Sequence, residues 1–228
     1  MNLKTYFIDQ ISGWKQTNYY LFYLCLGCQL MILLTQHLSA LSLITFIGTI
    51  TGILCLGSLN SARQICGYFG TISCLCFAYI AFKAHNFLNL FTYLINMGVM
   101  YLPIIFNPQW TKKDNIKKLG RQQWITIFIL YCIIFIVLGN TIQLLSNDPR
   151  PWLDALTLTI DIFGSILCCF KYRDQYLFWL ILNFCNVILW LFSFIQGDTT
   201  ISIAVNYIIY LISTFIGIFN SPWFGHQK

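Results

Sequence analysis

The stretch from Lys171 to Trp190 combines a basic turn with an apolar helix that carries aromatic and amide side chains. These side chains are spaced by three, four, three and four residues, so they share one helix face: Tyr176, Trp179, Asn183, Asn186 and Trp190. Aromatic rings can stack on a flat ring or contact a cation, and amides can fix its orientation through hydrogen bonds. The spacing therefore predicts one wall of a solute path through a membrane.

The composition places most of the chain in lipid. Of 228 residues, 58% are hydrophobic and only 9% are charged, whereas a soluble domain carries about 25% charged residues. The chain has seven acidic residues, all of them Asp. Water-facing parts must then be confined to short loops, because only helices or closed barrels satisfy their backbone within a bilayer. We expect an all-α integral membrane protein that is surrounded by membrane lipid.

Apolar runs of roughly 17 to 25 residues are candidate spanning helices. The sequence contains eight, at approximately 19–35, 38–57, 65–83, 86–106, 123–144, 151–171, 174–195 and 198–219. The longest polar break runs from Asn107 to Gln123, and the other links are short. The sequence thus predicts one helical bundle without a soluble domain, and no secretory signal is evident before the first run.

The placement of Lys and Arg predicts the orientation. With the N-terminus in the cytoplasm, eleven basic residues fall on the cytoplasmic side, and only Lys83 and Arg150 fall on the other. This bias favours an even number of spans with both termini in the cytoplasm. We interpret the basic loop from Lys112 to Arg121 as a topology anchor near anionic lipid. A regulatory or nucleic-acid patch is the alternative, and we expect no nucleic-acid partner.

The chain also contains an internal repeat. One constant shift along the chain lays Tyr68 on Trp179 and Gln64 on Gln175. The same shift lays predicted spans two to four on spans six to eight, with span five as a linker and span one outside the repeat. Parallel repeats around a site at the middle of the bilayer are typical of transporters.

Other predicted spans carry polar residues at helical spacing, among them Asn89, Asn96, Asp161, Ser165 and Asn206. Such residues often serve only to join helices through hydrogen bonds. Asp161 lies in the middle of its span, and no Lys or Arg lies at matching depth in any span. Ionisable residues at this depth usually face a cavity or a partner. We expect Asp161 to be protonated, hydrated, or opposite a cationic or hydroxyl-rich ligand; a purely structural hydrogen bond is the alternative.

Enzyme signatures are missing from the sequence. It contains no HExxH, P-loop or GxSxG motif and no Cys/His cluster at metal spacing. The pair Cys25 and Cys28 lies within an apolar run, where cysteines act as small core residues. We therefore expect neither an enzyme nor a metal or organic cofactor.

These residues resemble the PnuC family of bacterial vitamin transporters over roughly residues 40–223. The similar pieces are DALTLTIDIFGS at 154–165, the basic-acidic turn of Lys171 and Asp174, the helix with Tyr176, Trp179 and Asn183, TGILCL at 51–56 and GYFG at 67–70. The family's pattern in that helix is Trp-x-x-Trp-x-x-x-Asn, and Tyr176 stands in place of the first Trp. Asp161 and Ser165 also depart from the pattern, at positions that are expected to face the pocket.

The resemblance implies a fold related to the sugar-transporting SWEET proteins, with two three-helix bundles joined by a linker helix. The corresponding parts are residues 1–37 (tail and extra N-terminal helix), 38–106 (first bundle), 107–148 (basic loop and linker helix), 149–220 (second bundle) and 221–228 (tail). The resemblance also implies a homotrimer in the bacterial cytoplasmic membrane. Transport would be facilitated diffusion by alternating access, with the solute trapped inside the cell by phosphorylation.

Carried over by position, the residues that would contact the solute are Trp179, Asn183 and Trp190, with Asn89 and Asn96 from the first half. Together with the residues expected from spacing, the candidates are Tyr68, Asn89, Asn96, Asp161, Ser165, Tyr176, Trp179, Asn183, Trp190 and Asn206. The expected solute is nicotinamide riboside or a deoxynucleoside, and thiamine is the alternative. A membrane scaffold without a solute path is a different hypothesis, which predicts polar stripes packed helix to helix around a solid centre.

Overall fold

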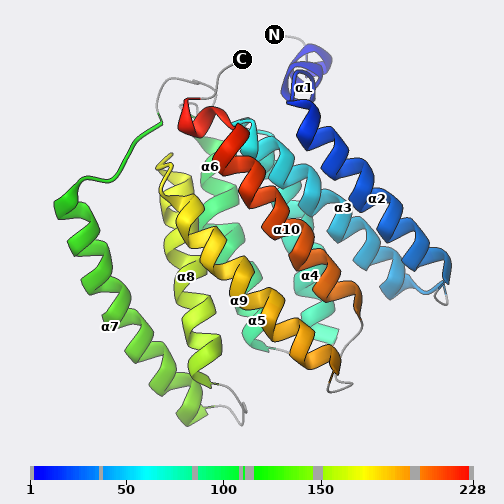
Figure 1. Ribbon diagram of the computed structural model, residues 1–228. Helices are drawn as coiled ribbons and strands as arrows, with labels where there is room; N and C mark the ends of the chain where they lie inside the picture. Colours follow the sequence, from blue (N-terminus) through cyan, green and yellow to red (C-terminus); the bar gives the residue numbers. More distant parts are fainter. Residues whose placement is uncertain are drawn as a thin grey trace.

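The computed structural model of the protein describes residues 3–35, 38–83, 87–107, 110, 116–145, 151–195 and 201–225. Regular structure in these ranges is helical (Figure 1). The longer elements in chain order are α1 (Leu3–Ile11), α2 (Gln16–Thr35), α3 (Ala40–Asn60), α4 (Cys66–Lys83), α5 (Phe87–Asn96), a π-helical segment (Met97–Tyr101), α6 (Leu102–Phe106), α7 (Arg121–Leu145), α8 (Pro151–Cys169), α9 (Gln175–Ile195) and α10 (Ile201–Asn220). The all-α prediction is confirmed.

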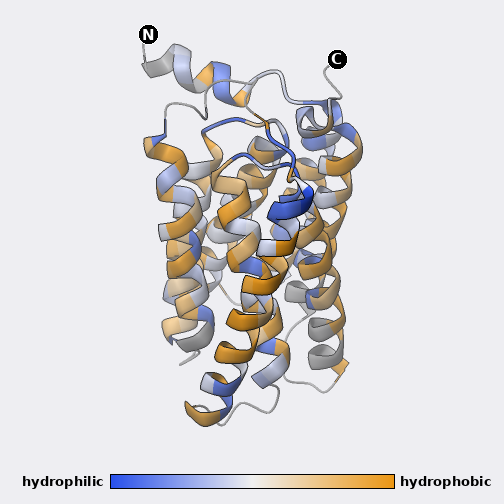
Figure 2. Cartoon of the chain, turned by 90° about the vertical axis from the view of Figure 1, so that its left-hand side faces the viewer, coloured by the Kyte–Doolittle hydropathy of each residue, from blue (hydrophilic) through white to orange (hydrophobic). Residues whose placement is uncertain are grey.

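Most of these helices can cross a membrane. Within the described ranges, six helices are long and apolar enough: α2, α3, α4, the run from α5 to α6, α7 and α8. Shorter apolar stretches lie in α9 at Gln175–Ile188 and in α10 at Val205–Asn220. Both chain ends lie at the same end of the bundle (Figure 1), and the densest hydrophilic group lies toward that end (Figure 2). The chain is a multi-pass integral membrane protein.

The helices form two neighbouring sets. In the first triplet, α4 packs against α3 and against α5–α6; in the second triplet, α9 packs against α8 and α10. Two seams join the triplets: α3 contacts α10 at the first seam, and α8 contacts α5 and Met97–Tyr101 at the second seam. Beside them, α7 packs along α8, and α2 packs along α3 and α10 (Figure 1). The predicted boundaries of the two bundles, linker and extra helix stay a prediction, which these contacts support.

The turns after α3 and after α8 have the same geometry. Ala62 and Lys171 occupy the left-handed backbone region, with φ of 51° and 59°. In each turn this residue's N–H bonds the carbonyl three residues earlier, and the next N–H bonds the carbonyl five residues earlier, as in the Schellman motif. When Ala62 is aligned with Lys171, Gly70 rather than Tyr68 corresponds to Trp179. The register that the sequence predicted for the repeat is therefore wrong by two positions.

The fourth predicted span, at 86–106, is one run of three segments rather than a uniform α-helix. The N–H of Leu102 bonds the carbonyl of Met97, five residues earlier, which defines the π-helical turn. Pro103 follows directly; it has no N–H, and its ring would crowd the carbonyl of Val99 in an α-helix. A single π-helical turn accommodates such a residue, and these turns are frequent at functional sites.

The short helix α1, which the sequence did not predict, packs against the turn between α3 and α4. Tyr6 Oη donates a hydrogen bond to Gln64 Oε1 at 3.2 Å. The backbone N–H of Ile65 donates to Gln10 Oε1 at 3.3 Å. Burial raises the pKa of the Tyr6 hydroxyl, which therefore stays protonated and able to donate. Much of the predicted polar tail is thus a folded part of the protein.

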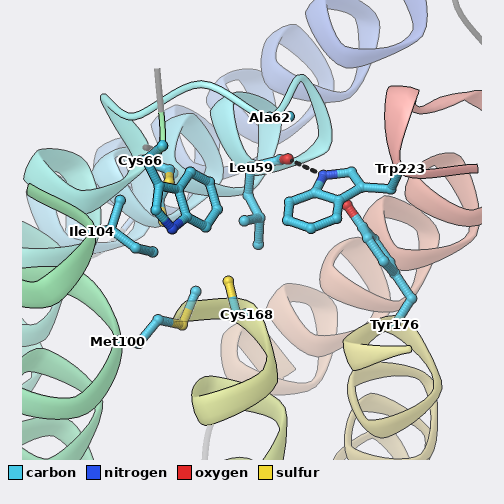
Figure 3. Packing of buried hydrophobic residues seen from close by; sticks show 10 residues of the cluster. Leu59, Ala62, Cys66, Met100, Ile104, Cys168, Tyr176 and Trp223 are labelled. Atoms are coloured by element: carbon cyan, nitrogen blue, oxygen red, sulfur yellow. Dashed lines mark hydrogen bonds between the residues drawn. The ribbon is translucent and has the colours of Figure 1, made fainter. Parts of the chain in front are cut away.

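An apolar cluster closes the end of the bundle where both chain ends lie, and it contains residues of both triplets (Figure 3). Its buried members include Leu59, Cys66, Met100, Ile104, Trp110, Cys168, Tyr176 and Trp223. Trp223 lies in a short helical turn after α10 and donates from Nε1 to the carbonyl of Leu59 at 2.7 Å. The cluster therefore forms an apolar plug on the predicted cytoplasmic side.

The described part of the basic loop is bonded to the turn between α8 and α9. The N–H of Lys117 donates to the carbonyl of Lys171 at 2.8 Å, and the N–H of Arg173 donates to the carbonyl of Lys117 at 2.9 Å. The N–H of Leu119 donates to the Asp174 carboxylate at 2.7 Å. Residues 111–115 lie outside the described residues, so the loop's role as an anchor near lipid stays a prediction.

Candidate solute-binding site

A cavity of about 440 Å³ lies between the two triplets. Residues of α2, α3, α4, α5, α8, α9, α10 and the π-helical segment line it. Pockets that hold small organic molecules measure about 300–1,000 Å³, so the cavity has the size of such a site. Among the described lining residues there is no Lys or Arg, whereas two, Asp154 and Asp161, are acidic. The remaining polar groups of the wall are amides, hydroxyls, thiols and an indole N–H.

Most of the predicted binding residues lie in the wall of this cavity: Asn89, Asn96, Asp161, Tyr176, Trp179, Asn183 and Asn206. The predicted polar face of α9 is therefore the face that borders the cavity, and Asn186 also lies on it. The backbone of Trp190 belongs to α9, but its side chain lies outside the described part of the structure. Four different helices thus bring together residues that the sequence separates by more than a hundred positions.

Trp179 is held against α8 by a close approach of the two helices. Its ring lies beside Gly164, where an added Cβ would come within 3.2 Å of the indole. Its Nε1 donates to Gln175 Oε1 at 3.3 Å, one turn earlier in α9. With its Nε1 bonded and its six-membered ring packed at Gly164, the indole can offer the rest of its surface to a flat ligand ring in the cavity.

Asn183 is oriented by a bond to α10. Its Nδ2 donates to Thr214 Oγ1 at 3.0 Å, and Thr214 Oγ1 donates in turn to the carbonyl of Tyr210 at 3.0 Å. Asn183 is buried, with 8% of its surface exposed, yet it borders the cavity. The amide is therefore presented to a solute in one fixed orientation.

Asp161, Asn96 and Ser165 form a chain of hydrogen bonds across the second seam. Asn96 Nδ2 donates to Asp161 Oδ2 at 2.7 Å, and Ser165 Oγ donates to Asn96 Oδ1 at 2.8 Å. Asn96 is the last residue before the π-helical segment. Ser165 is fully buried and is not in the cavity wall, so its position suits the orientation of Asn96 rather than direct contact with a solute. The sequence left open whether Asp161 makes a structural hydrogen bond or faces a cavity. In the structure it accepts a hydrogen bond from Asn96 and also borders the cavity.

Tyr68 does not reach the cavity. It lies on the outer face of α4 with 41% of its surface exposed. Tyr68 was expected at the cavity because the predicted register aligned it with Trp179. The alignment of the two turns instead makes Gly70 the residue that corresponds to Trp179. An added Cβ at Gly70 would meet the ring of Tyr101 at 2.2 Å, so in the first triplet Tyr101 fills the space beside the shorter side chain.

Asn60 and Gln29 are among the cavity residues that were not predicted. Asn60, at the end of α3, accepts from Tyr176 Oη at 2.9 Å and donates to Ser213 Oγ at 3.1 Å. Gln29 borders the cavity from α2, a helix outside the repeat. An isolated Gln in the middle of an apolar span is the signal that could have identified Gln29, because an amide is costly to leave unpaired in lipid.

Comparisons with known proteins identify related transporters. The protein family described as "Nicotinamide mononucleotide transporter" matches residues 42–224. The nicotinamide riboside transporter PnuC of Neisseria mucosa is 22% identical over 238 aligned residues, which cover 96% of this chain and 86% of that protein. The nicotinamide riboside transporter PnuC of Haemophilus influenzae is 25% identical over 221 residues, which cover 92% of this chain and 91% of that protein.

A solved structure shares the fold. The crystal structure of the vitamin B3 transporter PnuC matches with a TM-score of 0.81 and 20% sequence identity, covering 98% of this chain and 97% of that chain. At this identity the likeness shows a common fold and does not identify the solute.

Proposed function

The chain belongs to the nicotinamide mononucleotide transporter family, and from this membership and the cavity we propose that it carries a nucleoside-like vitamin or a nucleoside. It is a protein of a transporter family, not an enzyme. The proposed solute is nicotinamide riboside or a deoxynucleoside, and the proposed mechanism is facilitated diffusion by alternating access. The observation that carries the proposal is the polar cavity between the triplets, with Trp179 and Asn183 in its wall.

The cavity also argues against a scaffold without a solute path. That hypothesis requires polar stripes that pair with one another around a solid centre. The polar faces of α5, α8, α9 and α10 instead border a common space of about 440 Å³. A space of this kind supports a carrier that holds its solute between two triplets and exposes it to either side as one triplet rocks against the other.

The charges around the cavity favour a nucleoside over a nucleotide. A phosphate group in a site of low dielectric needs cationic or multiple donor partners. No Lys or Arg is present in the described part of the wall, and the carboxylate of Asp161 would repel a phosphate. The cationic ring of nicotinamide riboside would instead be attracted to Asp161 and could stack on Trp179.

Two other solutes fit parts of the same site. Thiamine also carries a cationic ring, which Asp161 could complement. A neutral deoxynucleoside could exchange a hydrogen bond with Asp161 when this residue is protonated. The ring stacking on Trp179 and the amide of Asn183 serve all three solutes, so Asp161 is the residue that we expect to discriminate between charged and neutral rings.

The topology belongs to the proposal as well. We propose eight crossings arranged as two three-helix bundles, a linker helix and an extra N-terminal helix, in the SWEET-like manner. The protein would lie in the bacterial cytoplasmic membrane as a homotrimer, with both termini in the cytoplasm. The common position of the two chain ends (Figure 1) supports the even number of crossings.

Uptake into proteoliposomes tests the proposed function. Labelled nicotinamide riboside should enter protein-containing vesicles in a saturable way and stop at equal concentrations inside and outside, and an imposed pH gradient should not change this end point. Excess unlabelled riboside should compete, whereas the corresponding mononucleotide should not. Uptake no faster than in empty vesicles, for the riboside, deoxynucleosides and thiamine alike, would refute the assignment.

A further inference from the structure

Gln29 borders the cavity from a helix outside the repeat and has an unpaired buried donor. Only 4% of its surface is exposed, yet its Nε2 has no hydrogen-bond partner. The residue borders the cavity from α2. Buried amide groups are nearly always bonded, because an unmade bond is unfavourable in a dry environment. A molecule bound in the cavity could therefore supply the acceptor that this N–H group lacks.

Asn206 presents the complementary group from α10. Its Oδ1 is buried without a hydrogen-bond partner, and the residue also borders the cavity. The wall thus contains an unpaired donor and an unpaired acceptor.

Helix packing brings these two residues to the same level of the bundle. Cys25 of α2 and Ile209 of α10 belong to one buried cluster, and the two helices run in opposite directions (Figure 1). Gln29 lies about one turn beyond Cys25, and Asn206 lies about one turn before Ile209. Since α2 and α10 run antiparallel, the step from Cys25 to Gln29 and the step from Ile209 to Asn206 lead in the same direction along the cavity wall.

We propose that Gln29 and Asn206 form a subsite for a sugar hydroxyl of the solute, an inference that rests on the proposed function. A hydroxyl is the group that accepts one hydrogen bond and donates another, so it can accept from Gln29 Nε2 and donate to Asn206 Oδ1. The ring would then lie on Trp179 of α9, and the sugar would face α2 and α10. The helix outside the repeat thereby selects nucleosides by their sugar.

Calorimetric titration of the purified protein tests this subsite. The probes are nicotinamide riboside, deoxyadenosine, and analogues of each that lack single sugar hydroxyls. Gln29→Leu should weaken binding of the parent nucleoside about tenfold, the effect of one lost hydrogen bond. The same substitution should leave unchanged the affinity for the analogue that lacks the hydroxyl bound at this subsite. Asn206→Leu should likewise weaken binding of the parent nucleoside and leave the affinity for that same analogue unchanged.

Thr17→Val is the matched control. Thr17 lies on the same helix, and its buried Oγ1 also lacks a partner, but it is not part of the cavity wall. Its substitution should leave every affinity unchanged. Gln29→Leu should not lower the thermal midpoint of the ligand-free protein, because it removes an unpaired buried amide; this readout separates lost recognition from lost folding.

The outcomes distinguish the two levels of the proposal. Unchanged affinities in Gln29→Leu, or an equal loss for the parent and for every analogue, would overturn the subsite and leave the carrier assignment standing. A wild-type protein that binds none of these nucleosides would overturn the carrier assignment and the subsite together.

Discussion

The two seams between the triplets use polar contacts at different depths. At the first seam the polar contacts lie at the end of the bundle that carries both chain ends, where Asn60 bonds Tyr176 and Ser213. At the second seam the polar contact lies in the middle of the span, where Asn96 bonds Asp161. The two seams of this repeated fold therefore differ in where their polar contacts lie.

The middle of the first seam has a glycine where the second has its carboxylate. When the two Schellman turns are aligned, with Ala62 on Lys171, Asp161 corresponds to Gly52. An added Cβ at Gly52 would come within 2.7 Å of the Tyr210 hydroxyl, so α3 and α10 approach closely there. We infer that the first seam holds the triplets together near the plug, and that the second seam presents charge to the solute.

The largest effect on the first seam is expected from Gly217→Ala. An added Cβ would meet the ring of Tyr176 at 2.1 Å and Asn60 Oδ1 at 2.7 Å. Overpacking a tight core costs about 1–3 kcal/mol, and we expect the upper part of that range, measured as a lower thermal midpoint in detergent. Gly27→Ala is the control, because its added Cβ would meet nothing within 4 Å beyond the local backbone of its own helix. A loss in Gly27→Ala as large as in Gly217→Ala would contradict the packing argument.

Asn60→Ala should have the next largest effect. It removes the bonds of Asn60 to Ser213 and takes from the buried Tyr176 hydroxyl the acceptor that Asn60 provides. Each lost hydrogen bond of this kind costs about 0.5–1.5 kcal/mol. We expect a lower thermal midpoint together with faster exchange of solute, since the closed side would open more easily. A variant with normal stability and normal exchange would show that this contact does not hold the triplets together.

Asp161→Asn tests the second seam. The new amide oxygen can still accept from Asn96, so stability should change by less than about 1 kcal/mol. The lost charge should lower the affinity for a cationic ring about tenfold, equivalent to about 1.4 kcal/mol, and should leave a neutral deoxynucleoside almost unaffected. Titration with both solutes measures the difference, and equal losses for the two would remove charge recognition from the role of Asp161.

The smallest effect is expected from Ser165→Ala. Ser165 touches the solute site only through Asn96 Oδ1, so its loss should cost about 0.5–1.5 kcal/mol of stability and reduce affinity only a few-fold. Ser165→Thr keeps the hydroxyl and should restore the affinity. A drop in affinity as large as that of Asp161→Asn would mean that Ser165 contacts the solute directly.

The sequence predicted the parts of this molecule that follow from helical periodicity. Apolar runs located the spans, and spacing along α9 identified Trp179 and Asn183 as residues of one face. The sequence predicted that Tyr68 corresponds to Trp179, because one constant shift aligned similar side chains across the repeat. This prediction was wrong, because the two Schellman turns align Gly70 with Trp179. A sequence offset contains no information about where a left-handed residue ends a helix.

The interactions between helices could not be predicted in this way. Gln29 belongs to α2, which has no counterpart in the repeat, and its relation to the cavity depends on how α2 packs against α3 and α10. The same holds for Asn60, two of whose partners lie 116 and 153 residues further along the chain. Periodicity assigns a face to a residue within its own helix, whereas these contacts depend on the neighbour that covers that face.

Solute flux through variants of the α9 wall is the most direct test of the carrier assignment. Wild-type protein, Trp179→Ala, Asn183→Ala and the exposed control Phe128→Ala of α7 would be reconstituted at equal density, and initial uptake of labelled nicotinamide riboside would be measured. We predict that both wall variants abolish uptake while remaining folded, and that Phe128→Ala transports at the wild-type rate. Undiminished uptake by both wall variants would contradict a path between the triplets.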